Sequence, residues 1–128
     1  MVKKMIVVLS ALALIMTSVG TEQQAVEISE ELIVRRLATC INIVPCLRSI
    51  YRWKGKICED TEHLLLIKTP QRLFDEVSAA IREFHSYELP EILAFPITNA
   101  ETSFHEWVLK MVQPSDDDVD EDNTPEYD

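Results

Sequence analysis

The stretch from Cys40 to Lys68, CINIVPCLRSIYRWKGKICEDTEHLLLIK, restricts the fold more than any other part of the chain. Its β-branched and aromatic residues favour strands, and Gly55 between two lysines offers a point where the chain can reverse. The run from His63 to Lys68 is nearly all apolar, as in a central or doubly covered strand. A long hairpin is therefore predicted. Because a hairpin alone is marginally stable in water, we expect helices on one face and another chain along its edges.

Four motifs in and around this hairpin occur in one order along the chain. They are LATCINIVP, SIYRWKGKI, HLLLIKT and HSYELPEILAFPI. Together they closely resemble the CutA family, the divalent-cation-tolerance proteins, over roughly residues 12–111. The resemblance implies a ferredoxin-like domain that assembles as a tight homotrimer. It also implies a role in tolerance of, or response to, divalent metal ions, particularly copper, without a settled biochemical activity.

The first twenty residues allow two interpretations. Two lysines, an apolar run and then small residues before position 21 are typical of a secretory signal peptide, although the run is too short to span a bilayer. The family resemblance instead places the first strand at 11–18, and cleavage after Gly20 would delete it. We therefore predict a cytoplasmic protein, with an exported or membrane-tethered form through residues 1–20 as the alternative.

The chain has three cysteines without C-x-x-C spacing, which indicates reduced thiols and neither a disulfide framework nor a zinc site.

The helices are predicted from caps and apolar spacing. Thr21 can cap a helix over 21–38, with the Gln24 side chain reaching back to it. Thr69 as cap and Pro70 at the first helical position open a second helix, which ends near Phe84. A short third helix follows, for which Ser103 and Glu106 suggest a capping box and which Pro114 ends.

The remaining strands are predicted at 62–69 and 91–97, besides the long strand that begins at Cys40. Pro45 must bend that strand, because proline cannot donate to a flat ladder, and Cys46 stands where family members commonly carry glycine. The order of strands and helices predicts an α+β, ferredoxin-like split β-α-β sandwich with an added C-terminal helix. Its antiparallel sheet has both long helices on one face, so neighbouring subunits are expected to bury the other.

Most of the net charge of −10 lies at the C-terminus. Eight of the 22 acidic residues fall in 116–128, which leaves 14 acidic against 12 basic residues elsewhere. The body therefore lacks the basic surplus of a nucleic-acid-binding domain, and we expect neither nucleic acid nor a membrane as a partner. We divide the chain into an extension at 1–10, a domain at 11–112 and an acidic tail at 113–128. The tail is expected to be disordered because it carries few apolar residues.

The family resemblance also points to metal ligands. Some bacterial relatives bind copper through a cysteine at the end of the first strand and two adjacent histidines at the end of the second helix. Here Met16 and Phe84-His85 occupy those positions. Methionine can still serve as a soft ligand for cuprous copper, so copper or another divalent cation is predicted at Met16 and His85. The alternative is that His85 is a hydrogen-bonded residue at a helix end.

A second candidate site is a cleft between subunits. His85, Tyr87 and Glu91 match the family's HPYE-type motif, with Ser86 in place of its proline. Together with Trp53 and Lys68 they could bind a small anion, metabolite or cation. The alternative is a network of hydrogen bonds and ion pairs that fixes the register of the trimer.

No phosphate-binding glycine loop and no G-x-S-x-G or H-E-x-x-H pattern occurs in the sequence, so we do not expect an enzyme. The function predicted is metal tolerance by binding or signalling in a trimer. The alternative is a trimeric signalling or structural scaffold, similar in architecture to the nitrogen-regulatory PII proteins, that binds a small molecule or a protein partner.

Overall fold

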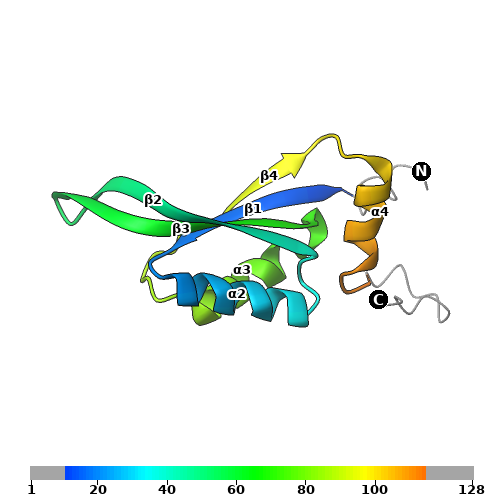
Figure 1. The fold of residues 1–128 in the computed structure, drawn as a ribbon, viewed down its shortest axis with the longest axis horizontal. Helices are drawn as coiled ribbons and strands as arrows, with labels where there is room; N and C mark the ends of the chain where they lie inside the picture. The colour runs from blue at the N-terminus through cyan, green and yellow to red at the C-terminus, as the bar shows by residue number, and fades with distance from the viewer. Residues whose placement is uncertain (1–10, 115–128) are drawn as a thin grey trace.

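A computed structural model describes residues 11–114 of the chain. Its helices α2 and α3 lie under one face of an antiparallel sheet, the β2–β3 hairpin projects beyond them, and α4 stands at the other end (Figure 1). The predicted α+β class and antiparallel sheet are confirmed. In chain order the elements are β1 (Leu12–Val19), α2 (Glu22–Val34), β2 (Cys40–Trp53), β3 (Lys56–Pro70), the 3-10 turn η1 (Gln71–Leu73), α3 (Phe74–Phe84), β4 (Leu93–Ile97) and α4 (Thr102–Lys110).

Strand β1 lies at the centre of the sheet, whose strand order is β2-β3-β1-β4. It pairs antiparallel with β3 on one side and with β4 on the other, so that Leu12 lies opposite both Pro70 and Ile97. The β2 and β4 strands form the two edges. None of the helices in residues 11–114 is both long and apolar enough to cross a lipid bilayer.

The core lies between the sheet and the two long helices. Ile15 and Ile67 are opposite each other on β1 and β3, and both are fully buried. The helices contribute the apolar stripes expected from their spacing, because residues three or four apart share a helix face. Two further apolar residues of α2, Val26 and Ile33, are exposed. The buried helix residues are Ala25, Ile28 and Leu32 on α2 and Val77, Ala80 and Ile81 on α3.

The predicted bend at Pro45 is a β-bulge. The register between β2 and β3 shifts between Val44 and Leu47. Cys46 has a φ of 61°, in the left-handed region where a side chain is strained and glycine is favoured. The backbone conformation at Cys46 is therefore one that suits the glycine commonly found here in the resembling family.

Two strand boundaries and one helix start differ from the predictions. The strand expected at 62–69 begins at Lys56, because the β2–β3 ladder continues to the turn. Thr69 and Pro70 end β3 instead of opening a helix, since the Thr69 hydroxyl donates to Leu37 O at 2.6 Å; α3 begins only after η1. The last strand begins at Leu93, not at residue 91.

The helix caps are also partly different. Thr21 accepts a hydrogen bond from Gln24 N at 3.1 Å, as predicted, but the Gln24 side chain donates to Phe84 O instead of reaching back. The predicted box of Ser103 and Glu106 is wrong. Glu101 caps α4 by accepting from the backbone N–H groups of Ser103 and Phe104, and these bonds lower the pKa of its carboxyl group.

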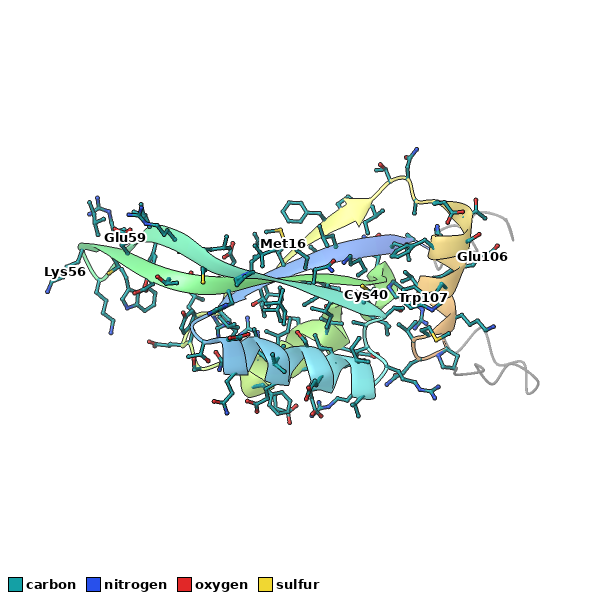
Figure 2. The ribbon with its side chains drawn as sticks, viewed as in Figure 1. Met16, Cys40, Lys56, Glu59, Glu106 and Trp107 are labelled. Carbon is teal, nitrogen blue, oxygen red and sulfur yellow. The ribbon has the colours of Figure 1, made fainter. Side chains whose placement is uncertain are left out.

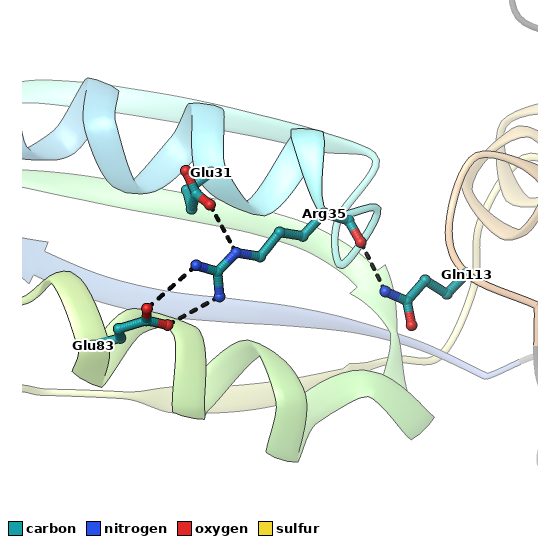
Figure 3. Close-up of polar contacts among 4 residues, drawn as sticks. All are labelled: Glu31, Arg35, Glu83 and Gln113. Carbon is teal, nitrogen blue, oxygen red and sulfur yellow. Dashed lines mark hydrogen bonds and ion pairs between the residues drawn. The ribbon is translucent and has the colours of Figure 1, made fainter.

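Arg35 joins the two long helices (Figure 3). Its guanidinium donates to Glu31 at 2.7 Å and to Glu83 of α3 at 2.9 and 3.4 Å. Glu83 and then Glu31 raise the Arg35 pKa, and the Arg35 guanidinium in turn lowers the pKa of Glu83. The α2 helix stops here, earlier than the predicted residue 38, because Arg36 has a φ of 58° and Leu37 N then donates to Leu32 O at 2.9 Å.

Gln113, which we assigned to the tail, is attached to the end of α2. Its backbone N–H donates to Arg36 O at 2.9 Å and its side-chain amide to Arg35 O at 2.8 Å (Figure 3). The Arg72 guanidinium donates to the Gln113 carbonyl. The remaining tail after Pro114 and the extension at 1–10 lie outside the described residues.

Candidate functional site

A loop after α3 crosses the end of β1 and is held there by His85. The helix ends because His85 adopts an extended backbone conformation. One ring nitrogen, Nδ1, accepts the Tyr87 N–H at 3.1 Å, and the other, Nε2, lies 2.8 Å from Ser18 O. An imidazole that accepts at Nδ1 is protonated at Nε2, which then donates to the carbonyl. Both ring nitrogens are therefore engaged in holding the loop.

Tyr87 turns from this loop toward the hairpin. Its ring packs against that of His85 at a centroid distance of 4.7 Å, and its hydroxyl donates to Glu62 Oε2 at 2.9 Å. Burial of the phenol, followed by the nearby Glu62, raises the pKa of Tyr87 well above its ordinary value of 10. Tyr87 thus stays a proton donor at neutral pH.

Glu62 is a buried acidic residue on β3. It is 6% exposed and lies opposite Leu47, directly beside the bulge in β2. Within residues 11–114, the ion pairs join Arg35 to Glu31 and Glu83 and Arg48 to Glu59; none includes Glu62. A carboxylate taken out of water without a cation is costly, so a neighbouring positive charge would stabilise it.

Glu62 and Tyr87 lie in the wall of a cleft of about 770 Å³, which we call the Tyr87–Glu62 cleft. The end of β1, both strands of the hairpin and the loop after α3 form it. Glu91, predicted as a site residue, lines it and accepts a hydrogen bond from the Ser18 hydroxyl at 3.3 Å. The lining residues are Ser18, Ser49, Ile50, Tyr51, Arg52, Trp53, Glu62, Ser86, Tyr87, Glu88, Leu89 and Glu91.

A second tyrosine–carboxylate pair lies farther out on the hairpin. The Tyr51 hydroxyl donates to Asp60, and this hydrogen bond raises the pKa of Tyr51 to about 12. Asp60 and Glu62 are two positions apart on β3, so their side chains share a face of the strand. Glu62 was not predicted as a site residue, because its partner Tyr87 lies 25 positions along the chain and the only sequence signal is its period-two spacing from Asp60.

The structure brings Trp53, Tyr87 and Glu91 together at the cleft. His85 is not among the lining residues, but it holds the loop through Ser18 O and the Tyr87 N–H. Lys68 is not among the lining residues. It lies opposite Cys40 on β2, where its ammonium donates to Asn42 Oδ1 and is 3.7 Å from Cys40 Sγ. Cys40 is at the α4 end of the sheet, far from Lys56 at the hairpin tip (Figure 2).

The predicted copper ligands do not form a ready-made metal site. Met16 lies opposite Leu66 and Leu93 on the sheet face away from the long helices (Figure 2). Both ring nitrogens of His85 are hydrogen-bonded, so a metal ion would have to displace the backbone from one of them. In the described part of the chain, no three or more His, Cys, Asp or Glu side chains are grouped so that they could hold a metal ion.

Comparison with known proteins gives one consistent result. The family model described as "CutA1 divalent ion tolerance protein" matches residues 13–111. The chain is 40% identical to the divalent-cation tolerance protein CutA of Thermus thermophilus over 94 residues, 73% of this chain and 91% of that protein. It is 37% identical to human Protein CutA over 77% of this chain but only 55% of the human protein, so it spans about half the length of that relative.

The fold is similar to solved structures as well. The crystal structure of CutA1 from Oryza sativa matches with a TM-score of 0.81 and 30% identity, covering 84% of this chain and 99% of that one. Some relatives have names that place them in the periplasm or the chloroplast.

Proposed function

This chain belongs to the CutA family of divalent ion tolerance proteins, and we propose on that premise that it acts in tolerance of divalent metal ions, particularly copper, by binding or signalling instead of catalysis. The proposed binding site is the Tyr87–Glu62 cleft. The observation that carries the proposal is the buried Glu62 carboxylate in the wall of an open cavity, where it accepts a hydrogen bond from Tyr87 but forms no ion pair within residues 11–114. Relatives are named for tolerance and not for a reaction, which agrees with a non-catalytic role.

The hydrogen bonds around the loop suggest how binding could be signalled. His85 attaches the loop to Ser18 O, the Ser18 hydroxyl bonds Glu91, and Tyr87 bonds Glu62. A ligand that contacts Glu62 competes with or reinforces the Tyr87 bond, so it shifts the position of the loop. Because the loop also leads into the edge strand β4, such a shift reaches the border of the sheet.

We further propose a ferredoxin-like homotrimer with these clefts at or near the subunit borders. The strand order and the two helices on one face support the fold. Exposed large apolar residues on β4 and α4 support association, since such patches are costly in water. They are Leu93, Phe95, Phe104 and Trp107, each between 39% and 45% exposed. Light scattering should show three chains per particle at micromolar concentration.

We place the protein in the cytoplasm. Its three cysteines are free thiols, which fits a reducing compartment. In addition, β1 is bonded on both sides, so cleavage after Gly20 would remove the centre of the sheet.

The test of this function is copper tolerance in cells. The full chain would be expressed in a copper-sensitive strain that lacks its own family member, beside Glu62→Gln and the control Glu27→Gln. Glu27 is exposed on α2, away from the cleft. Wild type and Glu27→Gln should restore growth, and a folded Glu62→Gln should not. Equal rescue by all three would overturn the proposed role of the cleft.

Direct copper binding at Met16 and His85 is the second candidate, because Met16 lies two positions before Ser18 on β1 and the His85 ring lies 2.8 Å from Ser18 O. Calorimetric titration of the reduced full chain with Cu²⁺ and Cu⁺ tests it. Saturable binding that is lost in His85→Ala and weakened in Met16→Leu would support it. Binding indifferent to both changes would contradict it and favour a PII-like scaffold that senses another ligand.

A further inference from the structure

The charge of the Tyr87–Glu62 cleft indicates the class of ligand, and this inference rests on the proposed function of the cleft. Of the residues that line it, Glu62, Glu88 and Glu91 are acidic and Arg52 alone is basic. Glu91 is partnered by Ser18 and Glu62 by Tyr87, both neutral hydroxyl donors. An anion would face an excess of carboxylates here, whereas a cation would be attracted.

Glu62 determines where in the cleft a cation would be attracted. The side chain is 6% exposed, so it is largely removed from water, yet it borders an open cavity. Its hydrogen bond comes from Tyr87, whose raised pKa keeps the phenol protonated and therefore able to donate. The phenol orients the carboxylate but does not neutralise it. A positive charge on the cavity side would offset the free-energy cost of burying this carboxylate.

Aromatic rings form the other part of the lining. Tyr51, Trp53 and Tyr87 are 41%, 39% and 37% exposed, so part of each side chain is accessible. The Trp53 indole already lies near a cation of the same chain, because Lys54 Nζ is 5.9 Å from the centroid of its ring. Ammonium groups bind ring faces of this kind through cation–π interactions.

A bare metal ion fits this lining less well than an organic cation. Metal ions need several donor atoms converging on one point, and no group of three suitable side chains occurs in the described part of the chain. Aromatic rings are not ligands for divalent ions. The volume of about 770 Å³ lies within the range of pockets for small organic molecules.

We propose that the Tyr87–Glu62 cleft binds a small organic cation, a primary or quaternary ammonium compound. Its ammonium group pairs with Glu62, and the carbon atoms bonded to that nitrogen lie against the rings of Tyr51 and Trp53. Tyr87 acts as a positioning residue that aims the Glu62 carboxylate.

The experiment is calorimetric titration of the full chain with 1,4-diaminobutane and, separately, with tetramethylammonium chloride. Both are run at one fixed ionic strength, because a chain of net charge −10 attracts cations non-specifically. We expect saturable binding, weakened at least tenfold in Glu62→Gln and unchanged in Glu27→Gln. Trp53→Leu is the second variant, should Glu62→Gln fail to fold; it should weaken tetramethylammonium binding severalfold.

Three results would overturn the inference. One is binding of equal strength in wild type, Glu62→Gln and Trp53→Leu, which would show non-specific attraction. Another is no amine binding although Glu62→Gln abolishes copper tolerance in cells; the proposed function would then stand with a different ligand. The third is no amine binding together with dissociation of the Glu62→Gln oligomer in light scattering, which would place the cation on a neighbouring copy. Failure of both amine binding and the tolerance test would remove the proposed function as well.

Discussion

Gly20 lies directly against the Tyr87 phenol: a Cβ at position 20 would stand 3.1 Å from the hydroxyl oxygen. That separation is shorter than ordinary van der Waals contact, so a methyl group there would push on the ring. Because the same hydroxyl donates to Glu62, the turn after β1 and the carboxylate of the cleft are mechanically connected.

Gly20→Ala should therefore lower the free energy of unfolding by about 1 kcal/mol, through displacement of the phenol. Thermal unfolding followed by circular dichroism measures the change. In a Tyr87→Phe background, which lacks the hydroxyl, the same substitution should cost less. An equal cost in both backgrounds would mean that the clash is not with the phenol.

Cys46→Gly should stabilise the protein by about 1 kcal/mol, because the left-handed conformation at position 46 is strained for any residue with a Cβ. Cys46→Ala is the matched control, since it also removes the thiol but keeps the Cβ. Chemical denaturation should place the glycine variant above both wild type and the alanine variant. If glycine and alanine gave equal stability, the backbone strain would not be the cause.

The Arg35–Glu83 ion pair should make stability depend on pH. Arg35 holds the Glu83 pKa below its ordinary value of 4.5, so the pair stabilises the fold above that value, and the contribution is lost as the pH falls through the lowered pKa. The difference in unfolding free energy between wild type and Glu83→Gln should be constant near neutral pH and shrink below pH 4.5. Arg35→Gln should abolish this dependence. Added salt should reduce it, because the pair is solvent-exposed.

Two deletions separate the tail from the anchored residue before it. Removal of residues 115–128 should leave the melting temperature unchanged, because this acidic segment offers little apolar surface. Removal of residues 113–128 also removes the hydrogen bonds of Gln113 to Arg35, Arg36 and Arg72, and should cost about 1–3 kcal/mol. Thermal unfolding of both proteins measures this. Identical melting temperatures would show that Gln113 contributes nothing.

The cap of α4 gives a further test of the structure against the sequence pattern. Glu101→Ala removes the acceptor for two backbone N–H groups and should lower the melting temperature, whereas Ser103→Ala should not. Glu101→Asp tests whether a shorter carboxylate still caps. A larger effect of Ser103→Ala would restore the capping box that the sequence suggested.

Local patterns identified most elements but not the contacts between them. The apolar spacing of α2 and the bulge at Pro45 follow from nearby residues, so both were predictable. The predicted helix start at Thr69 was wrong for a tertiary reason, because the Thr69 hydroxyl donates to Leu37 O, thirty-two positions away. Glu62 was missed for the same reason, since a carboxylate on a strand gives no signal of a tyrosine that reaches it from another element.

The central position of β1 also bears on how the protein is made. The first strand to leave the ribosome must wait for the last one, because Leu12 pairs with Ile97, near the opposite end of the domain. Such long-range pairing closes a large loop and slows folding. Until that moment, the backbone N–H and C=O groups along one edge of β1 are unpaired, so synthesis of this domain includes an interval in which chaperones or neighbouring nascent chains can compete for β1.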